Sequence, residues 1–231
     1  MLYKAFSDRL FSYLALYEKG LKKQANTDIQ ATAAWLRSLP AAEQDSILHQ
    51  FLTAYCDEAA WEPLHRRGNG NMPYALSESV REWLTPRCEA GNMPELRWYY
   101  ELFRNHPAGA EPAVRYLEAA YESIACDQKT VDLLLTSHLD TLGWGAHHFP
   151  EGCILEQAVI DQCMQQCKAI MAEHRVSEYL ACRFEYYKRL YACYEQYKAD
   201  GRTRDYAEYL KAAEIDDYCA KAFPTAEIQL N

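Results

Sequence analysis

The segment of this chain with the most reactive side chains is a glycine-rich loop between two predicted helices. It runs from Gly143 to Cys153 and contains two adjacent imidazoles, a carboxylate and a thiol, at His147, His148, Glu151 and Cys153. Such groups serve as metal ligands or as an acid/base pair. One hypothesis is therefore a metal- or small-ligand-binding protein, including an enzyme, centred on this loop.

Other features of the sequence argue against chemistry there. The paired C-x-x-C spacing typical of structural zinc sites is absent, and adjacent histidines more often point apart than toward one ion. Ser137, His138 and Asp140 are residue types of nucleophilic catalysis, but neighbours on one helix do not form a proton relay. The apolar face on which His138 falls predicts a core histidine. We assign no catalytic residue and expect no cofactor.

Composition narrows the classes of function further. Hydrophobic residues make up 49% of the 231 residues and charged residues 25%, which is usual for a globular protein. A net charge of −9 argues against nucleic-acid binding, and no apolar run approaches the roughly 20 residues that cross a bilayer. The N-terminal segment has the pattern of an amphipathic helix and not that of an export signal. An odd number of nine cysteines in such a chain favours reduced thiols, so we expect a cytoplasmic protein.

Negative charge is concentrated in one part of the chain. The segment 105–161 holds nine acids against two bases, Arg115 and Lys129. The acids could be solvated outer faces of helices or a surface that attracts a basic protein. Our leading hypothesis is a non-catalytic protein-binding module, either an adaptor or an inhibitor or immunity-type protein for a basic partner. The candidate contact residues are Glu111, Glu118, Glu122, Asp132, Asp140, Trp144 and Glu151.

Aromatic residues at helical spacing predict the fold class. Between Val176 and Lys198 two stripes of apolar and aromatic residues both recur with the 3.6-residue period, so this helix must be covered on two sides. The whole chain shows about ten such helices and no convincing strand. We expect an all-α protein of antiparallel helical hairpins, arranged as a bundle or a short α-solenoid-like stack.

Turn and cap residues predict the organisation of the chain. We expect a single all-α domain over 1–231, with a subregion boundary in the proline- and glycine-containing loop 61–76. The second helix is expected to start near Thr27 or Asp28. Asp127 is a predicted N-cap, and the helix that follows it is expected to end at Gly143.

The segment from Tyr194 to Phe223, and within it Gly201-Arg202-Thr203-Arg204-Asp205-Tyr206-Ala207-Glu208-Tyr209-Leu210-Lys211-Ala212-Ala213-Glu214-Ile215-Asp216, resembles the second half of a tetratricopeptide repeat. The resemblance covers about one unit and implies a helical-hairpin stack and peptide or protein binding. It assigns no binding residue. A remaining hypothesis is a structural homodimer in which tyrosine-rich stripes pair across subunits.

Overall fold

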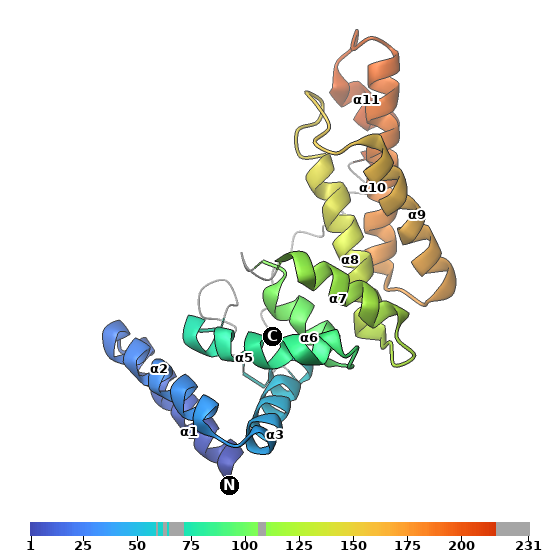
Figure 1. Cartoon of the computed structure of the whole chain (residues 1–231). Helices are drawn as coiled ribbons and strands as arrows, with labels where there is room; N and C mark the ends of the chain where they lie inside the picture. The colour runs from blue at the N-terminus through green and yellow to red at the C-terminus, as the bar shows by residue number, and fades with distance from the viewer. Residues whose placement is uncertain (59, 62–63, 65–71, 106–109, 216–231) are drawn as a thin grey trace. The chain divides into compact units, whose positions relative to one another are not determined.

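The computed structural model describes residues 1–231 except 59, 62–63, 65–71, 106–109 and 216–231 (Figure 1). Across these described residues the chain forms ten α-helices, one short π-helix and no strand. Neighbouring helices in the chain pack against one another as hairpins, for example α1 (Leu2–Glu18) with α2 (Lys22–Ser38). The all-α class predicted from the aromatic spacing is confirmed.

Contacts between Cα atoms divide the chain into two compact units, Met1–Ala125 and Cys126–Asn231. The division therefore falls elsewhere than in the loop 61–76, where the sequence indicated a boundary. Trp61 and Leu64 in that loop are buried, and the ring of Trp61 meets the ring of Phe51 edge-on at 5.7 Å. Apolar burial thus ties the described part of this loop into unit 1.

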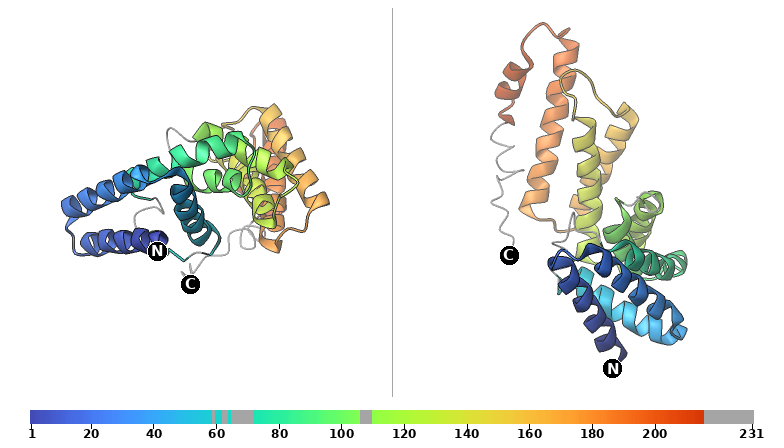
Figure 2. Two further views of the ribbon diagram at one scale, coloured as in Figure 1. Left: turned by 60° about the horizontal axis from the view of Figure 1, so that its bottom comes forward. Right: turned by 90° about the vertical axis from the view of Figure 1, so that its left-hand side faces the viewer.

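Unit 1 is a series of helical hairpins. After α1 and α2 it contains α3 (Ala41–Leu52), the π-helix η1 (Thr53–Asp57), α5 (Tyr74–Glu89), α6 (Glu95–Phe103) and α7 (Ala110–Glu122). Helices α1 and α2 lie side by side in both views of Figure 2, and α2, α5, α6 and α7 pack in chain order. The Gly-Asn-Met-Pro segment at 91–94 comes directly before α6, and Pro94 is the N-cap residue of that helix.

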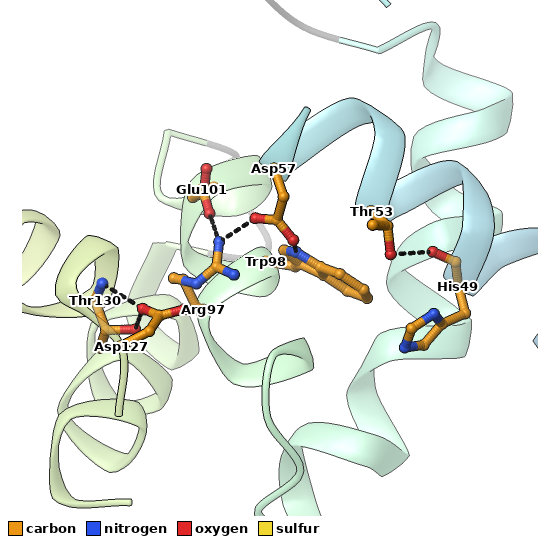
Figure 3. A network of polar contacts seen from close by, with 8 residues as sticks. All are labelled: His49, Thr53, Asp57, Arg97, Trp98, Glu101, Asp127 and Thr130. Atoms are coloured by element: carbon orange, nitrogen blue, oxygen red, sulfur yellow. Dashed lines mark hydrogen bonds and ion pairs between the residues drawn. The ribbon is translucent and has the colours of Figure 1, made fainter. Parts of the chain in front are cut away.

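A buried ion pair joins η1 to α6 in unit 1 (Figure 3). The Arg97 guanidinium, whose side chain is 4% exposed, donates to Asp57 Oδ1 and to Glu101 Oε1 at 2.7 Å each. The indole Nε1 of Trp98 donates to Asp57 Oδ2 at 3.0 Å. The π-helical turn, a wider turn that is rare in proteins, ends at Asp57, so it presents this carboxylate to two successive residues of α6.

A second carboxylate joins α3 to α5 in the same way. Asp45 Oδ1 accepts a hydrogen bond of 2.7 Å from Trp83 Nε1 and pairs with the Arg87 guanidinium, which lies over the Trp83 ring at 4.0 Å from its centroid. Both tryptophans would bury an unsatisfied N–H without these acceptors. Unit 1 therefore contains the same arrangement twice: an aspartate accepts a hydrogen bond from a tryptophan and forms an ion pair with an arginine of the same unit.

Unit 2 consists of α8 (Gln128–Gly145), α9 (Gln157–Glu173), α10 (Glu178–Ala199) and α11 (Tyr206–Ala212). Helix α10 contacts all three others, as the two-striped pattern predicted, and runs beside α8 and α9 in Figure 1. The predicted cap at Asp127 is confirmed, since its Oδ1 accepts from the amide and the hydroxyl of Thr130 (Figure 3). In the described part of the chain, every helix is too short or too polar to traverse a bilayer.

We predict that Asp57→Ala destabilises unit 1 by about 3 kcal/mol, because it leaves the buried Arg97 with one anion fewer and the Trp98 indole without its acceptor. Asp57→Asn keeps an acceptor for Trp98 and should lose less. Urea unfolding followed by tryptophan fluorescence measures this, since four of the five tryptophans lie in unit 1.

The matched control is Asp8→Ala, which removes an exposed carboxylate from α1 and should change the free energy of unfolding by under about 0.5 kcal/mol. Equal urea midpoints for Asp57→Ala and Asp8→Ala would show that the ion pair does not support unit 1.

Candidate functional site

The last turn of α8 packs against α10 through two glycines and two tyrosines. A Cβ atom on Gly143 would lie 2.5 Å from Tyr187 Oη, and one on Gly145 would overlap Tyr191 Oη. The Tyr191 hydroxyl also donates to the Leu142 carbonyl at 2.8 Å. The absence of side chains at these two glycines lets the tyrosine rings reach the backbone of α8, so the helix continues to Gly145 and does not end at Gly143.

Trp144 lies between the two glycines and is 61% exposed. Trp144 falls on the side of α8 opposite to the buried Leu135 and Leu142, so its side chain is directed away from the core. Its indole is stacked with the His147 imidazole, with ring centroids 6.0 Å apart and planes inclined by 5°. The result is an exposed aromatic pair on a backbone that is fixed by buried tyrosines.

The loop that follows α8 is held on α10 by aromatic stacking. The ring of Phe149 lies parallel to that of Tyr194 with centroids 3.9 Å apart, and it meets the ring of Tyr191 edge-on at 5.3 Å. The Gly145 carbonyl accepts from the Ile154 amide at 3.1 Å and from the Cys153 thiol at 3.4 Å. These contacts fix both ends of the loop and leave the imidazoles of His147 and His148 exposed.

The structure does not bring the four predicted metal ligands together. In the residues that it describes, no group of three or more His, Cys, Asp and Glu side chains is placed to hold a metal ion. The Cys153 thiol is turned to the Gly145 carbonyl, whereas the two histidines contact each other with ring centroids 5.1 Å apart and planes at 65°. The metal alternative for His147, His148, Glu151 and Cys153 has no geometric support here.

His138, which the sequence predicted to lie in the core, is only partly buried. It lies on α8, and burial lowers the pKa of its imidazole below the ordinary range. Partial burial with a lowered pKa is typical of a structural histidine. Ser137, His138 and Asp140 all lie on α8, and the Asp140 carboxylate accepts from Arg183 of α10.

Asp140 has an intramolecular partner that the sequence did not reveal. Its Oδ1 accepts from Arg183 at 2.9 Å, and the Arg183 side chain is only 9% exposed while that of Asp140 is 57% exposed. Desolvation lowers the pKa of this guanidinium, but hydrogen bonds to Asp140 and Tyr187 outweigh it and leave the pKa raised. Asp140 therefore neutralises a buried cation, and this is its first role.

The other predicted contact residues are divided between the two units. In unit 2, Glu151 is exposed, and Asp132 is half-buried and accepts from the Gln128 amide at 2.9 Å. In unit 1, Glu118 and Glu122 are exposed on α7. The side chain of Glu111 lies outside the described residues. We call the exposed group at the end of α8 the Trp144 surface, and it consists of Asp140, Trp144, His147, His148 and Glu151.

Sequence reasoning missed Arg183 and the role of the two glycines. The Gly-Trp-Gly sequence at 143–145 was the available signal, because a helix end with two glycines one residue apart is suited to a close approach of another element on one side. The identity of that element could not be read, because Tyr187 and Tyr191 lie more than 40 residues later. Arg183 falls on an otherwise apolar stripe and gave no signal of its partner.

Comparisons of this chain with protein-family models, with curated proteins and with solved structures give no match.

We predict that Gly145→Ala destabilises unit 2 by about 2 kcal/mol, because the new Cβ would overlap the Tyr191 hydroxyl and lie 2.6 Å from Leu155 Cδ1. Thermal unfolding by circular dichroism measures the loss. Adding Tyr191→Phe should recover part of it, because the phenylalanine has no hydroxyl where the methyl group must fit.

The control is Gly152→Ala in the following loop, where a Cβ would meet nothing within 4 Å, so its unfolding temperature should match that of the wild type. If Gly145→Ala and Gly152→Ala unfold at the same temperature, the close approach of α10 does not limit residue 145.

Proposed function

We propose that this protein is a non-catalytic protein-binding module, acting as an adaptor or as an inhibitor of a basic partner. The observation that carries the proposal is the exposure of Trp144, which presents a large aromatic ring to solvent beside His147 on a fixed backbone. Exposed tryptophans of this kind supply much of the binding energy at protein interfaces, because they bury a large area at a small cost in conformational entropy.

Charge around the Trp144 surface supports a basic partner. Asp140 and Glu151 are both exposed, and the chain as a whole has a net charge of −9. A protein with lysine or arginine around an apolar pocket would be steered toward this surface, and the steering would weaken with salt. Although Arg183 pairs with one oxygen of Asp140, more than half of the Asp140 side chain stays accessible.

The acids of unit 1 belong to the same proposal as a separate group. Glu118 and Glu122 are one helical turn apart on α7, so they lie on one side of that helix and are exposed. They would add to the attraction of a basic protein independently of the Trp144 surface. We further propose a cytoplasmic setting, which is supported by the free thiols of the eight cysteines that the structure describes.

Replacing Trp144 with alanine should weaken binding of the natural partner about 30-fold, which corresponds to about 2 kcal/mol for a central aromatic contact. Affinity purification from the native cell with quantitative mass spectrometry would identify proteins retained by the wild type and lost with Trp144→Ala. The dissociation constant is then measured with the purified partner at two salt concentrations.

Tyr74→Ala is the matched control, since Tyr74 is an aromatic residue that is 74% exposed on α5 of the other unit. Glu151→Lys tests the charge of the Trp144 surface. Its control is Glu18→Lys, which makes the same change of charge at an exposed position near the end of α1. The proposal is rejected if every retained protein binds Trp144→Ala and Glu151→Lys as well as it binds these two controls.

A further inference from the structure

We propose that a groove between α9 and α10 in unit 2 receives an amphipathic helix of a partner protein. The partner helix would carry a base, an apolar pair and an acid along one face. The groove shares no residue with the Trp144 surface, so the inference does not depend on the function proposed above. Its lining residues are Gln157, Ile160, Asp161, Met164, Lys168, Lys188, Tyr191, Ala192 and Glu195.

The floor of the groove is apolar and well fixed. Ile160 is 5% exposed and Tyr191 is 6% exposed, and the Tyr191 ring is held in place by the hydrogen bond from its hydroxyl to the Leu142 carbonyl. Met164 is half-buried beside them and can adapt its unbranched side chain to a ligand. Ala192 lines the groove from α10 and is exposed, and its small side chain leaves the space above the floor open.

The two ends of the groove carry opposite charges. Helices α9 and α10 are joined by a short connection and run in opposite directions, so the early residues of α9 lie level with the late residues of α10. Asp161 and Glu195 therefore lie toward one end, and Lys168 and Lys188 toward the other. Each helix separates its acid from its base by seven residues, which is about 10 Å at the rise of an α-helix.

These charged side chains are only weakly held within the protein. Lys188 pairs with Glu185 at 3.0 Å, Glu195 pairs with Lys198 at 2.9 Å, and the Asp161 carboxylate accepts from Gln157 at 2.8 Å. All are contacts within one helix at the surface, where water and salt screen the two ion pairs. A partner could therefore recruit these side chains at little cost.

Size and spacing favour a helix over a small molecule. The groove has a volume of about 260 Å³, which is below the roughly 300–1,000 Å³ usual for small-ligand sites but sufficient for one or two apolar side chains of a larger partner. On a helix, residues at i, i+3, i+4 and i+7 share one face over the same 10 Å. On the partner helix, a base at i would pair with the acidic end of the groove, and an acid at i+7 would pair with its basic end. Apolar residues at i+3 and i+4 would pack on the floor between them.

A phage-displayed library of alanine-based helices, randomised at those four positions, tests the inference on the full-length protein. We expect selection on the wild type to enrich one combined pattern, with apolar residues at i+3 and i+4 and opposite charges at i and i+7. Helices with this pattern should be at least tenfold more frequent than in the unselected library. Either order of the two charges agrees with the inference, because the helix can enter the groove in both directions.

Two variants give the decisive comparison. Ala192→Arg places a long side chain over the floor from an exposed position and should abolish the enrichment, whereas Ala169→Arg, at an exposed alanine of α9 outside the groove, should not. The double variant Lys168→Glu with Lys188→Glu makes both ends acidic and should shift selection to helices with bases at both i and i+7. Thermal unfolding of each variant confirms that it is folded.

The inference is overturned if no pattern is enriched on the wild type, if Ala192→Arg and Ala169→Arg select the same helices, or if the double variant leaves the charges unchanged. Binding through the Trp144 surface is scored separately, because Trp144→Ala leaves the groove intact and should retain the enriched helices.

Discussion

The close approach of α10 to the last turn of α8 is the contact on which the end of α8, the loop after it and the α9–α10 groove all depend. Tyr191 fills the space above Gly145, donates to the Leu142 carbonyl and forms part of the floor of the α9–α10 groove. Phe149, which holds the loop, packs against the same ring. One buried phenol thus supports the end of a helix, a loop and a groove, and burial raises its pKa well above the ordinary value, so it remains a neutral donor.

How far the sequence predicts this structure depends on the distance over which each residue acts. The aromatic stripes of α10 are a local pattern, and they correctly indicated a helix covered on more than one side. The start of α2 was placed too late, near Thr27, because a threonine at a helix start and one inside a helix look alike. In the structure the Thr27 hydroxyl donates to the Lys23 carbonyl one turn earlier, so α2 already begins at Lys22.

The partners of charged residues are still harder to predict from the sequence, because they lie far away along the chain. Asp140 was selected because it belongs to an acidic segment, yet its carboxylate neutralises Arg183, which lies 43 residues later on α10. In unit 1, Asp57 and Asp45 each accept from an indole and pair with an arginine of another helix, and nothing in their local sequence distinguishes them from surface acids. Net charge therefore predicts the field of the whole chain well, but it cannot show which acids remain free to bind a partner.

The exposure of Trp144 follows from the same packing that buries its neighbours. The core side of α8 is formed by Leu135, Leu139 and Leu142, and Trp144 falls opposite to them on the helix. The Trp144 ring consequently lies in solvent, where it stacks with His147. A tryptophan left exposed costs free energy that burial would recover, and among the described residues the stacking with His147 covers only part of the ring. This unrecovered cost is the physical reason to expect that another protein covers the ring.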